Sequence, residues 1–189
     1  MGKVDSKTRS MIIRVAEDMM LENGYAAVTS RKIAARANVS FQLVHYYFHS
    51  MDDLFLAMLD RSTDLYKREL RKIAKSSRPL TGLWEMNVRS RRSALSVQFM
   101  ALAVHNEHVR VALKQFGDLF RDRQIAIIAQ HLESRGGSQV GPPPEVLAVT
   151  IENIARMMVF SDAIDLSRGH RATADYVTSY LKELEGADV

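Results

Sequence analysis

A short stretch that begins at Ser40 groups hydrogen-bonding and aromatic side chains within a few residues. It reads Ser-Phe-Gln-Leu-Val-His-Tyr-Tyr-Phe, and Val44 occupies the position of a buried helical residue. On a helix with Val44 inside, the outward face carries five side chains: Ser40, Phe41, Gln42, His45 and Tyr46. A face that meets only water seldom carries two large aromatic rings. The stretch therefore predicts a recognition surface.

Two short helices with a tight turn between them would position this surface. Thr29 can cap the first helix, because its hydroxyl can accept a hydrogen bond from a first-turn amide. Asn38 tolerates the left-handed backbone that a sharp turn needs, and Ser40 can cap the second helix. Ala34 is small enough for close helix approach, and Val44 fills the angle between the helices. The arrangement predicts a helix-turn-helix that recognises DNA, with an ordinary helical hairpin as the alternative.

Flanking helices complete the unit, since two helices alone cannot bury their shared face. An amphipathic helix is predicted to end at Asn23, with Gly24 in the left-handed conformation beyond its last turn. Ser50 and Asp53 resemble a capping box at the start of a long helix over residues 51–75. The sequence thus predicts a three-helix unit followed by a connecting helix.

The composition is typical of a globular protein, with 47% hydrophobic and 25% charged residues among 189. No apolar run approaches the roughly 18 residues of a membrane span, and the N-terminus has no secretory signal. Because the chain has no cysteine, no disulfide is predicted and a reducing cytoplasm is expected. Residues 1–75 contain 13 Lys and Arg against 9 Asp and Glu, whereas residues 76–189 contain 13 of each. The positive surplus lies with the helix-turn-helix, as binding to a polyanion requires.

The remainder of the chain has helical periodicity and no strand pattern, so an all-α fold of about nine or ten helices is predicted. Residues 80–135 divide into about three helices, and the Gly- and Pro-rich stretch 136–144 is predicted to be a loop. Two helices follow, over 145–167 and 173–184. The first of them has apolar residues on more than one face, which predicts burial on two sides.

Residues between positions 24 and 54 share the spacing of a known family: Gly24, Val28-Thr29, Ile33-Ala34, Ala37, Val39-Ser40, Tyr46-Tyr47-Phe48 and Leu54. With these residues the chain resembles the TetR family of bacterial transcriptional regulators. The resemblance implies a homodimer whose recognition helices enter successive major grooves of a near-palindromic operator in double-stranded DNA. It also implies a repressor that a small-molecule effector releases from DNA.

The resemblance further implies two domains. Residues 1–50 would form the DNA-binding domain, and residues 51–189 a helical effector-binding and dimerisation domain that begins with the connecting helix 51–75. Carried over by position, the DNA-binding residues are Thr29, Ser30, Arg31, Ser40, Phe41, Gln42, Leu43, His45, Tyr46, Tyr47 and Ser50.

The chemistry of several of these residues agrees with such a role. Gln42 can pair with adenine through two hydrogen bonds, and Arg31 can pair with guanine or contact a phosphate. Phe41 or Leu43 can meet the methyl group of thymine. Three further side chains suit phosphates, which fix the register on DNA: Ser30, His45 and Tyr47.

Two positions depart from the family pattern. His45 stands where the family usually has a Tyr, and Met51 stands where it usually has a Lys that contacts a phosphate. Without that Lys, the helix N-terminus and Ser50 have to hold the phosphate. DNA binding is therefore predicted to be less sensitive to salt, by about one contact per subunit.

The body of the chain is rich in Met and aromatic residues, and a mainly apolar effector is predicted because pockets in helical bundles are usually apolar. The predicted effector-binding residues are Trp84, Asn87, Phe99, Met100, Phe116, Phe120, Asn153, Met157 and Phe160. The predicted dimer interface on the last two helices comprises Val149, Ile164, Tyr176, Tyr180 and Leu184. No cofactor and no membrane partner are predicted, and the protein is expected in the cytoplasm, on the nucleoid when bound to DNA.

Two other interpretations stay open. His105 and His108 lie at a spacing that can chelate a metal, as a metal-dependent helical enzyme would require. Two ligands are insufficient, however, and the chain has no familiar catalytic motif, so no catalytic residue or metal site is predicted. Alternatively, the face of Phe41 and Tyr46 could dock a partner protein, as in a helical adaptor.

Overall fold

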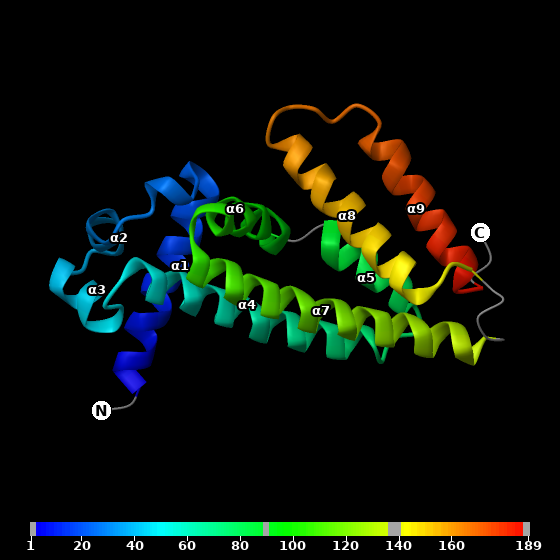
Figure 1. Ribbon diagram of the computed structural model, residues 1–189, viewed down its shortest axis with the longest axis horizontal. Coiled ribbons are helices and arrows are strands. Elements are labelled where there is room, and N and C mark those ends of the chain that lie inside the picture. Colours follow the sequence, from blue (N-terminus) through cyan, green and yellow to red (C-terminus); the bar gives the residue numbers. More distant parts are fainter. Residues whose placement is uncertain (1–2, 89–90, 136–140, 187–189) are drawn as a thin grey trace. The chain divides into compact units, whose positions relative to one another are not determined.

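The computed structural model describes residues 3–88, 91–135 and 141–186, which form nine α-helices and one short 3-10 helix (Figure 1). In chain order the elements are α1 (Lys3–Asn23), η1 (Tyr25–Ala27), α2 (Ser30–Ala37), α3 (Phe41–Tyr47), α4 (Met51–Ile73), α5 (Pro79–Val88), α6 (Arg91–His105), α7 (Glu107–Ser134), α8 (Pro144–Asp162) and α9 (His170–Leu184). No strand occurs in these three ranges. The prediction of an all-α fold with nine or ten helices is confirmed.

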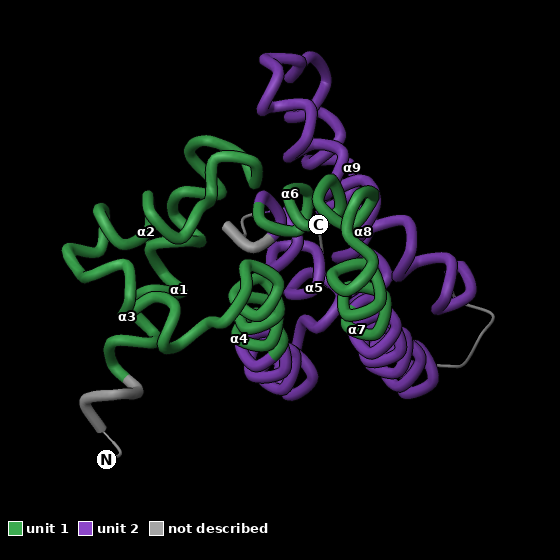
Figure 2. Tube along the Cα trace, turned by 60° about the vertical axis from the view of Figure 1, so that its left-hand side comes forward, with its two compact units in different colours: residues 1–63, 95–116 green, residues 64–94, 117–189 purple. Residues whose placement is uncertain are grey.

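The chain divides into two compact units (Figure 2). Unit 1 comprises Met1–Thr63 and Leu95–Phe116, and unit 2 comprises Asp64–Ala94 and Gly117–Val189. Helices α4 and α7 each contribute residues to both units. The predicted domain boundary between residues 50 and 51 follows chain order, whereas each compact unit combines two separate stretches of chain. That boundary stays a prediction.

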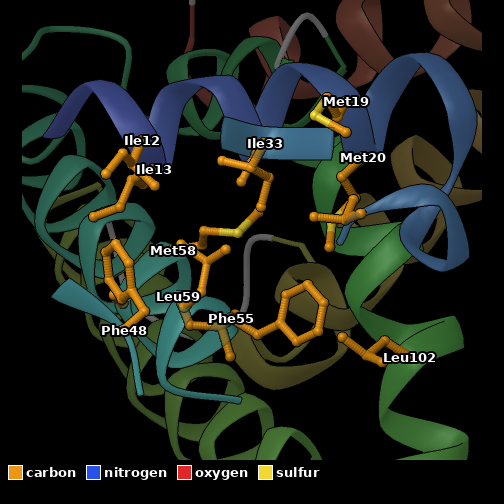
Figure 3. Packing of buried hydrophobic residues seen from close by; sticks show 14 of the residues in the cluster. Ile12, Ile13, Met19, Met20, Ile33, Phe48, Phe55, Met58, Leu59 and Leu102 are labelled. Carbon is orange, nitrogen blue, oxygen red and sulfur yellow. The ribbon is translucent and has the colours of Figure 1, made fainter. Parts of the chain in front are cut away.

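Unit 1 has a continuous apolar core to which six helices contribute, namely α1, α2, α3, α4, α6 and α7 (Figure 3). Helix α1 supplies Ile12 and Met20, and α2 supplies Ile33, in the i, i+3, i+4 pattern of an amphipathic helix. The other elements supply side chains that meet them, among them Val44, Phe48, Phe55, Met58, Leu95, Phe99 and Leu102. The helix-turn-helix is therefore packed on α1 and α4 and also on a segment that follows it by about 50 residues in the chain.

Unit 2 is organised around the short helix α5. It packs against α8 and α9 and is buried along most of its length. The matching face of α8 buries Leu147, Ala148, Ile151 and Ala155. Each of these contacts removes apolar surface from water, which is the main source of stability for such a bundle.

Three predicted details differ from the structure. Helix α8 ends at Asp162, five residues before the predicted end, because Asp165 adopts a left-handed conformation with φ 58°. Gly24 does follow the last residue of α1 and has a positive φ of 77°, which favours glycine, but its ψ of 164° differs from that of the predicted left-handed helical turn. Of the predicted loop 136–144, residues 136–140 lie outside the described residues and Pro144 begins α8. Among the described helices, none combines the length and apolar character needed to cross a membrane.

Candidate nucleic-acid interface and effector site

The turn between α2 and α3 is fixed by local hydrogen bonds, as the sequence predicts. The Thr29 hydroxyl accepts from the Lys32 amide at 3.4 Å, and the Ser40 hydroxyl accepts from the Leu43 amide at 3.2 Å. Asn38 has φ 51° and ψ 48°, which is the left-handed conformation that ends α2. Side chains therefore cap the starts of both helices, and the backbone amides of Asn38 and Phe48 bond to the last turns of α2 and α3.

The outward face of α3 is formed by the residues that the pattern singles out. Val44 is buried, whereas Phe41 is 39% and Tyr46 is 59% exposed, and Gln42 and His45 are exposed between them. The rings of Phe41 and His45 meet edge to face with centroids 4.4 Å apart. The Phe41 ring also has the guanidinium of Arg31 over it at 5.9 Å, so α2 and α3 present one continuous face.

The other predicted DNA-binding residues lie around this face at different depths. Thr29 and Ser50 are exposed and act as helix caps, Leu43 is half-buried, and Tyr47 is half-buried against the core. Ser30 is half-buried as well, and its hydroxyl donates to the sulfur of Met51 at 3.3 Å. The Ser30 hydroxyl already has an acceptor inside the protein, which weakens its case as a phosphate contact.

The start of α4 has the predicted capping box. The Ser50 amide donates to the Asp53 carboxylate at 3.0 Å, and the Asp53 amide donates to the Ser50 hydroxyl at 3.1 Å. Two backbone amides at the helix N-terminus that have no acceptor within the helix are hydrogen-bonded in this way. Because only three residues separate α3 from α4, the capping box fixes how the chain leaves the recognition helix.

Helix α1 holds α2 in place by a charged contact. The guanidinium of Arg36 donates to both oxygens of Glu22, at 2.5 and 2.6 Å. This hydrogen bond raises the pKa of Arg36, with the negative charges of Glu22 and Asp18 acting in the same direction. A second contact comes from Arg9, whose guanidinium lies 5.1 Å from the ring centroid of Phe48, just after α3.

Polar side chains of α6, of α7 and of the residue between them form hydrogen bonds with both ends of the helix-turn-helix, within unit 1. The backbone amide of Tyr25, which precedes α2, donates to Gln98 on α6 at 3.2 Å. Asp52, which follows α3, accepts from the Asn106 amide at 2.6 Å and lies 2.9 Å from Nδ1 of His108. The hydrogen bonds from His108 and Asn106 lower the pKa of Asp52. No sequence pattern predicted these contacts, since their partners are more than 50 residues apart.

The two histidines considered as metal ligands have other surroundings. His108 contacts Asp52, and His105 is exposed at the end of α6. Within the described residues, no group of three or more His, Cys, Asp or Glu side chains is arranged to hold a metal ion. His108 therefore contributes to the α6–α7 junction of unit 1 through its contact with Asp52.

Three of the predicted effector-binding residues come together in unit 2. Trp84 and Asn87 lie one turn apart on α5 and are buried, and the Nδ2 of Asn87 lies 3.4 Å from Oε1 of Gln124 on α7. Phe120, one turn before Gln124, meets the ring of Tyr66 from α4 at 4.4 Å. We call these five residues the amide–aromatic cluster. Gln124 is 0% exposed, and its Nε2 finds no acceptor among the described residues.

The other six predicted effector-binding residues lie elsewhere. Phe99, Met100 and Phe116 belong to unit 1, where Phe99 is part of the core and Met100 is exposed. On α8 the three remaining residues are exposed to solvent: Asn153, Met157 and Phe160. Their spacing of three to four residues places them on one face of α8, and the exposed Ile164 follows the end of that helix.

Helices α8 and α9 leave a substantial apolar surface uncovered in unit 2. Ile164 is 60% and Tyr176 is 72% exposed, and the rings of Tyr176 and Tyr180 stack with an interplanar angle of 1°. Val149 is half-buried beside this stripe, whereas Leu184 is buried within unit 2. Large exposed apolar patches of this kind mark interaction surfaces.

Comparisons with known proteins agree with this architecture. Residues 12–58 match the model of the bacterial regulatory proteins of the tetR family. The HTH-type transcriptional regulator HbdR of Aromatoleum sp. (strain CIB) is 33% identical over 82 residues, or 43% of this chain and 36% of that protein. The chain thus matches only about a third of the length of that curated relative.

Solved structures match over nearly the whole chain. GusR of Salmonella enterica has a TM-score of 0.73 at 18% identity, with 95% of this chain and 96% of that chain covered. A TetR transcription regulator from Haloarcula marismortui ATCC 43049 has a TM-score of 0.74 at 19% identity, covering 96% and 98%. FadR from Bacillus subtilis, solved in complex with stearoyl-CoA, has a TM-score of 0.67 at 16% identity, covering 95% and 99%. At these identities the structures establish the fold.

The capped α2–α3 pair, its exposed face and the helical body define a helix-turn-helix protein of the all-α class. The family match makes this class more specific for α1 to α4: residues 12–58 are similar to the bacterial regulatory proteins of the tetR family.

Proposed function

We propose that this protein is a ligand-responsive, DNA-binding transcriptional regulator that represses genes from a near-palindromic operator. It would act as a homodimer on the bacterial nucleoid, and a small, mainly apolar effector would release it. The observation that carries the proposal is the exposed face of α3, held on a turn whose caps match the sequence pattern and whose residues lie within the family match. An adaptor role for the same face finds no separate support.

The solvent exposure of the individual side chains on α3 refines the proposed DNA contacts. Gln42 is exposed at the first turn, where a recognition helix meets base edges, so we assign it the pairing with adenine. Phe41 is exposed and Leu43 half-buried, which favours Phe41 as the contact to a thymine methyl. Arg31 stacks over Phe41 and would meet a guanine or phosphate beside it. His45, Tyr46 and Tyr47 would line the groove and its phosphates.

Replacing Met51 by Lys is expected to add one phosphate contact per subunit. Met51 is half-buried at the N-terminus of α4, so a Lys there can bury its stem and direct its charge outward. The slope of log K against log salt should steepen by about 0.9 per subunit, and affinity should rise. Fluorescence anisotropy of a labelled operator over a range of salt concentrations measures both quantities. A steeper slope without any gain in affinity contradicts this explanation.

The uncovered stripe on α8 and α9 supports the proposed homodimer. Exposed apolar side chains on both helices would pair with the same side chains of a second copy, as a two-fold interface requires. The exposure of Met157 and Phe160 places them in this stripe. We therefore propose that they join Ile164, Tyr176 and Tyr180 in the dimer interface, in place of their predicted effector role.

The amide–aromatic cluster supports the proposed effector site. Buried amide groups usually have hydrogen-bond partners, and a buried donor without an acceptor costs stability. Gln124 offers such a donor one turn from Phe120, which suits an apolar ring compound that carries one acceptor oxygen. No Lys or Arg belongs to the cluster, so a carboxylate buried there would lack a counter-ion. We infer an uncharged effector, with Trp84, Asn87 and Phe120 as predicted contacts and Tyr66 and Gln124 as further ones.

Replacing Gln124 by Leu separates an effector role from a structural one. Because the change removes an unpaired buried donor, the free energy of unfolding should stay equal or rise, while binding of an uncharged aromatic ketone should weaken by about tenfold. Trp84 is the sole tryptophan and a member of the cluster, so its fluorescence reports binding of 1-tetralone or acetophenone directly. A Leu variant that loses stability but keeps ketone affinity shows that Gln124 is structural only.

Contacts from the middle of α6 and from the α6–α7 junction suggest how an effector would affect the DNA-binding face. Gln98 holds the chain before α2, and Asn106 with His108 holds Asp52 after α3. Helix α7 carries both His108 and the effector contact Gln124. A shift of α6 and α7 would therefore displace both ends of the helix-turn-helix. We propose this displacement as the route by which the effector releases the protein from DNA.

Selection of bound fragments from genomic DNA tests the proposed function as a whole. Fragments retained by the protein should share a dyad-symmetric sequence, because two copies of α3 would read two half-sites. Compounds that quench Trp84 should release the protein from those fragments. Retained fragments without a shared symmetric sequence would refute the proposal.

A further inference from the structure

A recess on the surface of unit 2 lies apart from the amide–aromatic cluster. It runs between the last turns of α4 and the second half of α7 and has a volume of about 370 Å³. Its apolar lining includes the buried Leu70 of α4, together with Leu119 and Ile127 of α7, which are partly exposed. A volume of this size falls within the range of small-molecule sites.

Three cations converge on this recess. Lys67 and Arg71 lie one turn apart on α4, and Arg123 faces them from α7. All three are exposed, and none forms an ion pair with a carboxylate of the described residues. The Nε of Arg71 donates to the backbone oxygen of Lys67 at 3.1 Å, which fixes the start of its guanidinium group. We call the recess with these three side chains the cationic groove.

The lining combines two properties that a solvated helix face rarely combines. Its cations come from two helices and lack local counter-ions, and an apolar floor lies beneath them. Neither Asp nor Glu is among the side chains that the structure places along the groove. A guanidinium group matches a carboxylate or sulfonate through paired hydrogen bonds, and the floor matches an alkyl or aryl chain.

We propose that the cationic groove binds an amphipathic anion, with its acidic head on Arg71, Arg123 and Lys67 and its apolar chain along Leu70, Leu119 and Ile127. This site is separate from the proposed effector cluster, which lacks cations. It adds to the protein a second ligand class, the medium-chain carboxylates.

Calorimetric titration of the full-length protein with decanoate tests the proposal. One decanoate is expected to bind per chain, with an affinity that falls as salt rises because the contact is ionic. The double variant Arg71→Gln/Arg123→Gln should weaken binding by at least about tenfold, since it removes both paired charge-assisted contacts. Decan-1-ol, which has the same chain and no charge, should bind at least about tenfold more weakly than decanoate.

A matched control separates local charge from overall charge. Arg68→Gln/Lys75→Gln removes the same two charges from exposed positions near the end of α4 that do not line the groove, and decanoate affinity should be unchanged. Equal affinities in the two double variants would overturn the proposal. So would loss of decanoate binding in Gln124→Leu, because the anion would then occupy the amide–aromatic cluster. Loss of decanoate binding in Arg71→Gln/Arg123→Gln alone supports the proposal, whether or not the protein binds an operator.

Discussion

Replacing Gln42 by Ala should weaken binding to the selected operator by about 1–3 kcal/mol for each half-site and abolish discrimination at one base pair. Gln42 is exposed on the first turn of α3, between Phe41 and the buried Val44. Its amide can give two hydrogen bonds to adenine, which a methyl group cannot replace. The salt dependence of binding should stay the same, because Gln42 is uncharged.

The stability of the protein should hardly change in this variant. Ala has the highest helix propensity, and an exposed substitution usually alters the free energy of unfolding by less than about 0.5 kcal/mol. Gln115→Ala, at an exposed position of α7 in the same unit, is the matched control and should leave DNA binding intact. Anisotropy titrations against the operator and its single-base variants measure the effect. A loss spread evenly over all sequences would show that Gln42 reads no base.

Replacing Glu185 by Ala should lower the free energy of unfolding by about 3 kcal/mol, because several buried donors lose their acceptor. The Glu185 carboxylate is 5% exposed and accepts from the Leu80 amide at 2.6 Å. It also accepts from the amide of Thr81 at 3.1 Å and from its hydroxyl at 2.6 Å. Helix α5 begins at Pro79 and follows Arg78, whose side chain has no acceptor for the first-turn amides. Glu185 thus caps α5 from a position about 100 residues later.

Thermal unfolding followed by circular dichroism checks this expectation. For a chain of this size, the loss corresponds to a fall in Tm of about 6–12 °C. Glu183→Ala removes an exposed carboxylate two residues earlier on α9 and should change Tm little. Glu185→Gln keeps one acceptor oxygen, so its Tm should lie between those of Glu185→Ala and Glu183→Ala. If Glu185→Ala and Glu183→Ala melt alike, Glu185 does not cap α5.

Local hydrogen bonds explain why the helix-turn-helix could be predicted in detail. The Thr29 and Ser40 caps, the left-handed Asn38 and the capping box of Ser50 and Asp53 each join residues at most three or four apart. Such signals are contained within a short stretch of sequence, and all of them were confirmed.

Contacts between distant residues could not be predicted in this way. Nothing near Pro79 indicates that Glu185 completes its helix, and nothing near Asp52 indicates that Asn106 and His108 hold it. The apolar pattern also fails to separate buried residues from exposed ones. Met157 fits the helical stripe of a buried residue, yet it is 55% exposed on α8. For the same reason the fully buried Gln124 was missed, since a single Gln in a helix carries no sign of its burial.

Hydroxyl-radical footprinting of the selected operator tests the central claim most directly, namely that two copies of α3 read a two-fold symmetric site. Wild-type protein should protect two patches whose centres lie about 10 base pairs apart, or one helical turn of DNA. The Gln42→Ala variant should lose both patches together, whereas Gln115→Ala should keep them. A single protected patch, or an even protection that the Gln42 substitution leaves unchanged, would contradict the account.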